Sequence, residues 1–192
     1  MKVLLLSPYN TSIRDFIEDF GDDVHQISRA ILKDELSEFD ADYFISYGYR
    51  HILGLDIVEE ICNRAINLHL SYLPWNRGAD PNLWSIIEDT PKGVTIHRIS
   101  SRVDSGNILA QARITFSPQD TLATSYNKLR ELIETLFCTY WQEIRLNQIV
   151  EIPQEHDCAT HHYKKDIDLV RNFLPYGWNT RLDTIKKLDN YR

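Results

Sequence analysis

Short apolar stretches alternate with helical patterns over the first 70 residues, and this alternation limits the fold more than any other feature. The apolar stretches have the length of buried strands and lie at 3–7, 24–28, 43–47 and 65–70. Helical spacing fills the intervals at 12–20, 30–39 and 56–63. Strands joined through helices pair in parallel. The sequence therefore predicts an α/β fold with a mostly parallel, Rossmann-like central sheet flanked by helices.

The second half of the chain extends this sheet and covers it. A short helix is predicted at 82–89, a strand pair at 94–99 and 108–115, and one long amphipathic helix at 121–147. The pattern then weakens, with short helices predicted at 166–173 and 182–188. We expect a catalytic domain over 1–150 and a C-terminal appendage over 151–192 that packs on the domain or between subunits.

Composition excludes several classes of function. With 192 residues, 43% of them hydrophobic, the chain can bury the core of one domain. The net charge is −7 and no Lys/Arg-dense run occurs, which disfavours a nucleic-acid partner because phosphate neutralisation needs clustered cations. The apolar N-terminal run is too short for a signal peptide, so we expect no membrane association and a cytoplasmic location.

Cysteine and histidine spacing does not indicate a metal site. The three cysteines are far apart and form no Cys-x-x-Cys pair, so reduced thiols are expected. His156, His161 and His162 lie close together, but the adjacent pair must alternate in direction on any regular backbone. No carboxylate or cysteine falls at ligand spacing beside them. We therefore expect no metal.

One amide, one imidazole and one carboxylate have the chemistry of acyl transfer to an amine. On a strand over 65–70, Asn67 and His69 project from the same face. An amide can donate to the oxyanion of a tetrahedral intermediate, and an imidazole can take the proton of the attacking amine. Asp104, in the loop between the later strands, would orient the His69 ring and favour its imidazolium form. Each of these motifs is common when it occurs alone. Their order and spacing in one chain are what indicate a catalytic site.

The segment 65–110 resembles the catalytic core of the folate-dependent formyltransferases. It carries Asn67-Leu68-His69, then Leu73-Pro74 and Gly78, then Asp104-Ser105-Gly106. This family includes glycinamide ribonucleotide, methionyl-tRNA and amino-sugar formyltransferases. The resemblance implies that Asn67, His69 and Asp104 are catalytic and that 10-formyltetrahydrofolate is the co-substrate. We also predict a cis peptide at Leu73-Pro74.

The resemblance also implies where the folate would bind. In the family, the pteridine lies against loop backbone that corresponds here to 48–53 and 100–103. The predicted donor contacts are Tyr49, Arg50, His51, Leu53, Ser101, Arg102 and Val103. An ordinary strand-to-helix turn is the alternative for the first loop. Arg50, His51 and Arg102 would then be solvated, whereas in a folate site they would steer its acidic tail.

Two segments suggest which acceptor the protein uses: one differs from the glycinamide ribonucleotide enzymes, and the other resembles the amino-sugar enzymes. Residues 7–12 lack the glycine-rich phosphate loop of the glycinamide ribonucleotide enzymes. The run 72–85 is most similar to amino-sugar formyltransferases, and its Trp84 is expected to pack in the core. The predicted acceptor contacts are Tyr9, Asn10, Trp75, Asn76, Arg77 and Gly78.

The function that follows is formyl transfer to the primary amine of an amino sugar, expected to be nucleotide-linked and of the kind used for surface glycans or nonulosonic acids. Three alternatives remain open: a phosphoribosylglycinamide formyltransferase, a 10-formyltetrahydrofolate deformylase, and a non-catalytic folate- or sugar-nucleotide-binding module. The resemblance is compatible with a homodimer.

Overall fold

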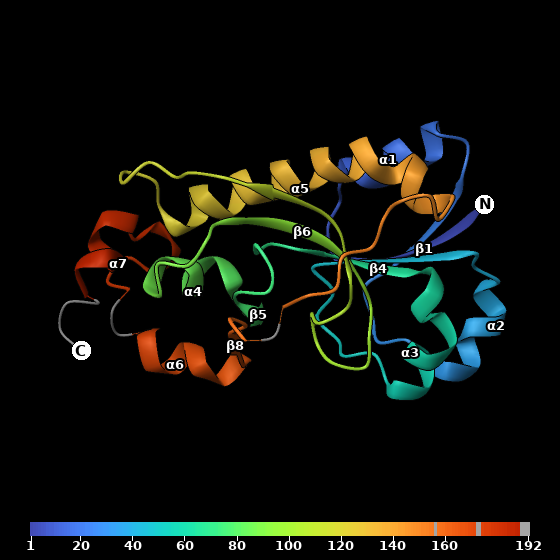
Figure 1. The fold of residues 1–192 in the computed structure, drawn as a ribbon, viewed down its shortest axis with the longest axis horizontal. Helices are drawn as coiled ribbons and strands as arrows, with labels where there is room; N and C mark the ends of the chain where they lie inside the picture. The colour runs from blue at the N-terminus through green and yellow to red at the C-terminus, as the bar shows by residue number, and fades with distance from the viewer. Residues whose placement is uncertain (156, 172–173, 189–192) are drawn as a thin grey trace.

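A six-stranded mixed sheet forms the centre of the protein (Figure 1). The computed structural model describes residues 1–155, 157–171 and 174–188. The sheet has the order β2-β1-β3-β4-β6-β7, in which the first four strands are parallel, β6 pairs antiparallel with β4, and β7 pairs antiparallel with β6. This confirms the predicted fold. The strands are β1 (Lys2–Leu6), β2 (Asp23–Ile27), β3 (Tyr43–Tyr47), β4 (Ala65–His69), β6 (Gly93–Arg98) and β7 (Ile108–Arg113).

Helices α1 (Ser12–Asp19) and α5 (Leu122–Arg145) cover one face of the sheet (Figure 1). The Thr121 hydroxyl caps α5 by accepting a hydrogen bond from the Thr124 N–H. The buried stripe of α5 packs on strand residues such as Ile66 and Leu68. The helix residues in this cluster are Leu129, Ile133, Phe137, Trp141 and Ile144.

Helices α2 (Leu36–Phe39) and α3 (Leu55–Ile61) cover only part of the opposite face. They pack on Leu4, Leu6, Phe44 and Ala65, from β1, β3 and the start of β4. The helix predicted at 30–39 is shorter than expected. Leu32 is extended, and a 3₁₀ turn (Lys33–Glu35) leads into α2 because the Glu35 carboxylate accepts the Leu32 N–H and binds Arg29.

A third cluster joins the C-terminal segment to the domain. It contains side chains from α4 (Pro81–Ile87), α6 (Ile167–Val170) and α7 (Leu182–Leu188). The helix predicted at 166–173 is α6, preceded by a 3₁₀ turn (Lys164–Asp166), and positions 172–173 lie outside the described residues. Further 3₁₀ turns span Cys62–Arg64 and Gly177–Asn179.

Two short strands that the sequence did not indicate form a separate small sheet and attach this segment to the loop after β4. β5 (Arg77–Gly78) pairs in parallel with β8 (His161–His162). Two residues are too few to show a strand period, so no pattern could predict them. Whether residues 151–192 also contact a second subunit stays a prediction.

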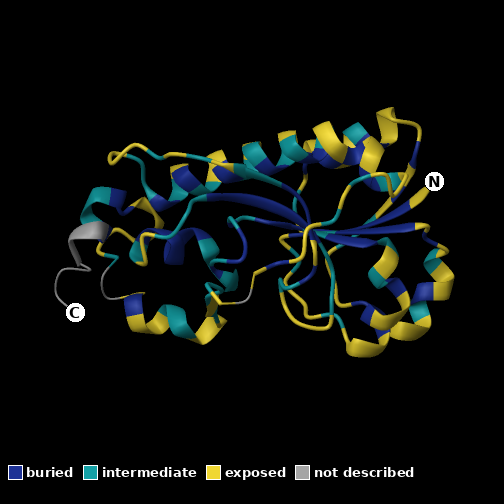
Figure 2. Ribbon diagram, in the orientation of Figure 1, coloured by how far each residue is buried: buried dark blue, intermediate teal, exposed yellow. Residues whose placement is uncertain are grey.

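Burial follows this layering: the strands are buried, whereas the outer sides of the helices are exposed (Figure 2). Among the described helices, none combines the length and the apolar character needed to cross a bilayer.

Candidate active site

Asn67 and His69 lie on the part of the sheet face that α2 and α3 leave uncovered. Ile66 and Leu68 point into the cluster under α5, so Asn67 and His69 point to the opposite side, as the strand period predicts. On that side Asn67 pairs across the strands with His97 of β6. The amide of Asn67 donates to Oδ1 of Asp104 at 3.0 Å.

The loop between β6 and β7 brings Asp104 back to these strands. Asp104 has φ 50°, a left-handed conformation that Asp tolerates better than most residues. Its Oδ2 accepts the N–H of Gly78 at 2.8 Å and lies 3.5 Å from Nδ1 of His69. Gly106 permits this loop because a Cβ there would lie 2.0 Å from the Arg98 carbonyl oxygen. The three residues predicted to be catalytic are therefore in contact.

Both ring nitrogens of His69 face acceptors. Nδ1 faces Asp104, and Nε2 lies 3.1 Å from the carbonyl oxygen of Asn76. A neutral imidazole carries one N–H and can satisfy only one of these acceptors at a time. The ring can thus gain a second proton with a hydrogen-bond acceptor already in place.

Burial controls the charge of this pair. Burial lowers the pKa of His69, and the negative charge of Asp104 opposes that shift without cancelling it. Asp104 thus raises the pKa of His69, in the direction expected. Burial lowers that pKa by more, so the neutral ring is favoured. Burial also acts to raise the pKa of Asp104, yet the two histidines and the Gly78 N–H leave it below the usual range.

A second histidine, His97, completes the cluster and was not predicted. It is 2% exposed, and its Nε2 lies 3.4 Å from Oδ1 of Asp104 and 3.2 Å from Nδ2 of Asn67. In the sequence, His97 lies within an apolar strand and resembles an ordinary core residue. The one available signal was its register opposite Asn67, which requires the antiparallel pairing of β4 and β6.

The loop after His69 is fixed by its own hydrogen bonds. Leu73-Pro74 is cis, as predicted. The side chain of Asn76 is fully buried, where it donates to Glu88 and accepts the hydroxyl of Thr90. The backbone of Asn76, rather than its side chain, therefore faces His69.

Gln154, which lies beyond α5, ties the Asp104 loop to β5. Its side-chain amide donates to the carbonyl oxygens of Asp104 at 3.0 Å and Gly106 at 2.7 Å. Its carbonyl oxygen accepts two hydrogen bonds from Arg77, at 3.1 and 2.6 Å. Sequence reasoning missed this residue because it lies in a polar run after Pro153 that looks like a surface connector.

The predicted donor contacts lie in two exposed loops. Arg50 and His51 follow β3, and Ser101, Arg102 and Val103 precede Asp104; all five are exposed. Leu53 packs on the same apolar cluster as Ile99, which brings the ends of the two loops to one region. The hydroxyl of Tyr49 donates to the carbonyl of Arg29.

The predicted acceptor contacts fall into two groups. Tyr9 and Asn10 line a hollow of about 360 Å³ at the carboxyl ends of β1 and β2, together with Arg14 and Gln26. The Tyr9 hydroxyl lies 2.6 Å from that of Tyr126. The second group, Trp75, Asn76, Arg77 and Gly78, lies in the loop around His69, where Trp75 stacks on Tyr72 at 6.2 Å. Tyr9 and Asn10 therefore lie in a different part of the structure from the loop that carries Trp75 to Gly78.

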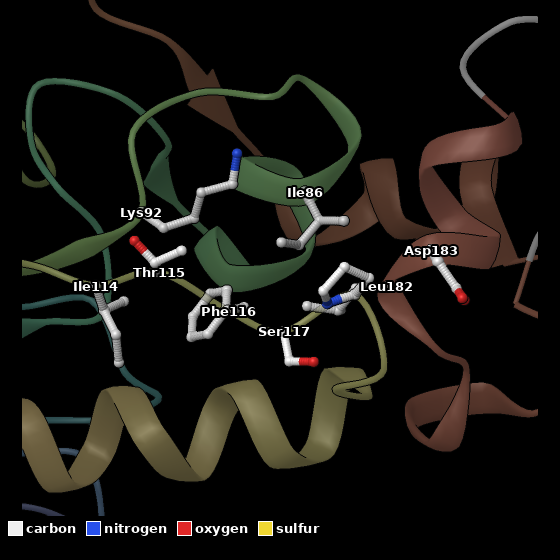
Figure 3. Close-up of a pocket in the computed structure, with 9 residues that line it drawn as sticks. Ile86, Lys92, Ile114, Thr115, Phe116, Ser117, Leu182 and Asp183 are labelled. Atoms are coloured by element: carbon white, nitrogen blue, oxygen red, sulfur yellow. The ribbon is translucent and has the colours of Figure 1, made fainter.

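A second hollow, of about 400 Å³, holds none of the predicted site residues (Figure 3). Ile86, Phe116 and Leu182 supply its apolar wall. Trp84 is 4% exposed and stacks on His162, so it packs internally as expected. His156 is outside the described residues, and within the described ranges no three His, Cys, Asp or Glu side chains form a group that could hold a metal ion.

Comparison with known proteins identifies relatives of this arrangement. Residues 20–140 match the model of the formyl transferase family. The formyltransferase PseJ from Anoxybacillus kamchatkensis, solved with UDP-4,6-dideoxy-4-formamido-L-AltNAc and tetrahydrofolate, is 48% identical over 96% of this chain and 97% of that chain, with a TM-score of 0.92.

Two more distant structures share the fold. A 4-N formyltransferase from Francisella tularensis is 20% identical over 98% of this chain and 86% of its own, with a TM-score of 0.79. A sugar N-formyltransferase from Shewanella is also 20% identical, over 98% and 87% of the two chains, with a TM-score of 0.78.

Proposed function

The chain belongs to the formyl transferase family, and from that premise we propose that it transfers the formyl group of 10-formyltetrahydrofolate to the primary amine of a nucleotide-linked amino sugar. The observation that carries the proposal is the contact of Asp104 with both Asn67 and His69. This cluster supplies an oxyanion donor and a proton acceptor at one position.

The reaction can be written with these side chains in place. The acceptor amine attacks the formyl carbon, and a C–N bond forms while the carbonyl oxygen becomes an oxyanion. An N–H of Asn67 donates to that oxyanion. His69, neutral before attack, takes a proton from the amine, and Asp104 stabilises the imidazolium. The bond from carbon to N10 of the folate then breaks, and N10 leaves with a proton returned by His69.

The relative from Anoxybacillus supports the choice of acceptor. Its complex contains a UDP-linked sugar with a formamido group at carbon 4, together with tetrahydrofolate. We propose the corresponding 4-amino sugar, UDP-4,6-dideoxy-4-amino-L-AltNAc, as the acceptor to test first. An identity of 48% over nearly the whole chain supports this choice more than the distant relatives do.

The two exposed loops around Arg50 and Arg102 are proposed to receive the folate. Backbone groups of exposed loops remain available to a flat heterocycle, and the two arginines match its acidic tail. For the acceptor, we propose Trp75 and Arg77 near the amine and Tyr9 and Asn10 near the carrier. The polar hollow at Tyr9 supports the second pair.

The decisive experiment measures tetrahydrofolate release from 10-formyltetrahydrofolate. Reactions contain no acceptor, the UDP-4-amino sugar, dTDP-linked amino sugars, or glycinamide ribonucleotide. Release that depends on an amino sugar supports the proposal. Release with glycinamide ribonucleotide alone, or equal release without any acceptor, contradicts it in favour of purine synthesis or a deformylase. Folate binding without release under any condition would contradict catalysis itself.

We further propose a cytoplasmic location. Cys62, Cys138 and Cys158 are free thiols, which fits a reducing compartment. Cell fractionation tests the location, and sedimentation velocity tests whether the protein is the homodimer that its resemblance allows.

A further inference from the structure

His97 lies against the two groups that flank His69, yet the reaction as written does not use it. It sits at an irregularity of register between β6 and β7, and its ring is nearly perpendicular to that of His69 at 6.1 Å. A buried imidazole between an amide and a carboxylate has few ways to satisfy its nitrogens.

The tautomer of His97 follows from its backbone contact. Nδ1 lies 2.8 Å from the carbonyl oxygen of Arg98, and a carbonyl can only accept, so Nδ1 carries a hydrogen. In the neutral ring Nε2 is then a bare acceptor. Nε2 lies 3.2 Å from Nδ2 of Asn67 and 3.4 Å from Oδ1 of Asp104, and of these two atoms only Nδ2 carries a hydrogen that a bare nitrogen can accept. Nδ2 of Asn67 therefore has two acceptors beside it, Nε2 of His97 and Oδ1 of Asp104.

These two acceptors fix the orientation of the Asn67 side chain. Turning the amide over would place its carbonyl oxygen against the Asp104 carboxylate and the lone pair of His97. We propose that His97 is a positioning residue that holds one N–H of Asn67, so that the other N–H, which donates to Asp104 in this structure, is the one that passes to the formyl oxygen during the reaction. This inference rests on the catalytic role proposed for Asn67.

Two polar substitutions separate this role from a purely structural one. His97→Asn can still donate to the Arg98 carbonyl, as Nδ1 does, but it is too short to reach Asn67. His97→Gln loses the ring and can place an acceptor oxygen near the Nε2 position. A role through Asn67 predicts that the glutamine variant keeps activity, whereas a role through Arg98 predicts that the asparagine variant does.

We expect His97→Asn to lower kcat about tenfold, the order of one hydrogen bond, with KM for both substrates within about twofold. His97→Gln should recover kcat to within about threefold of the unsubstituted protein. In an Asn67→Ala background, His97→Asn should cause no further loss, since its effect acts through the missing amide. Thermal unfolding of each variant checks that it is folded.

Other outcomes overturn the inference. Full activity of His97→Asn, equal losses in both variants, or the same tenfold loss without Asn67 would each exclude positioning through the amide. Failure of the proposed function looks different, because the unsubstituted protein would then show no release that depends on an amino sugar. Failure of the role proposed for Asn67 would appear as an Asn67→Ala variant that turns over as fast as the unsubstituted protein. The positioning role alone fails when Asn67→Ala slows turnover and His97→Asn does not.

Discussion

Oδ2 of Asp104 lies 3.5 Å from Nδ1 of His69, while the other nitrogen of the ring faces the carbonyl oxygen of Asn76 at 3.1 Å. Each ring nitrogen therefore has a hydrogen-bond acceptor for the N–H that it would carry in the imidazolium form. Burial keeps it neutral beforehand, because it lowers the pKa of His69 more than Asp104 raises it. A buried, neutral imidazole beside a carboxylate is an acceptor for the proton of an attacking amine.

Replacing His69 by asparagine should remove this acceptor. We expect kcat for tetrahydrofolate release to fall on the order of a hundredfold or more, because positioned proton transfer contributes that much. Steady-state kinetics with the amino-sugar acceptor measures the loss, and circular dichroism checks the fold. Turnover that survives in a folded His69→Asn variant would exclude the proposed mechanism.

The acid side of the pH profile should report the charge of His69. Because attack needs the neutral ring, kcat/KM should fall as pH drops through its pKa, which lies below the ordinary 6.5. Asp104→Asn removes the charge that raises this pKa, so the acid limb should move to still lower pH while kcat decreases. The measurement is kcat/KM against pH for both proteins. A limb that moves to higher pH in Asp104→Asn would contradict this assignment.

Gln154→Leu should loosen the Asp104 loop. The substitution leaves the carbonyl oxygens of Asp104 and Gly106 without their donor, which should lower the free energy of unfolding by about 2 kcal/mol or more. We also expect a lower kcat, since Asp104 loses a fixed position. Denaturant unfolding and kinetics measure the two effects.

Gln148→Leu is the matched control for that variant, because this glutamine is exposed and also lies in the segment that follows α5. It should change neither quantity appreciably. If both variants behave alike, the hydrogen bonds of Gln154 are not what holds the loop.

Gly78→Ala should separate β5 from β8. Gly78 has φ 86°, and a Cβ there would lie 2.2 Å from the carbonyl oxygen of His162. Gly21, with φ 93° and no atom within 4 Å of its Cβ position, is the control for backbone strain alone. Gly21→Ala should cost about 1 kcal/mol, and Gly78→Ala about 2 kcal/mol more from the clash.

Thermal and denaturant unfolding of the two alanine variants gives the comparison. Only Gly78→Ala should also slow turnover, because the Gly78 N–H donates to Asp104. Equal destabilisation of the two would show that the β5–β8 contact contributes little.

What could be predicted from the sequence depended on local pattern. The period of β4 placed Asn67 and His69 on one face, and the alternation of strands and helices predicted the parallel part of the sheet. His97, Gln154 and the β5–β8 pair depend on contacts between distant segments, and none carries a local signal. The catalytic trio itself was predicted through the resemblance, since Asp104 reaches His69 only in the folded chain.

The contacts of Gln154 and β8 also set an order of events during synthesis. Thr160 accepts the N–H of Asn76 on its hydroxyl, and the His162 carbonyl lies against Gly78, so residues made late support loops made early. A nascent chain that has emerged only to the end of α5 already has every strand of the main sheet. It still lacks the hydrogen bonds of Gln154 and the β5–β8 pair, so we expect its turnover to stay low until about seventeen more residues have been added.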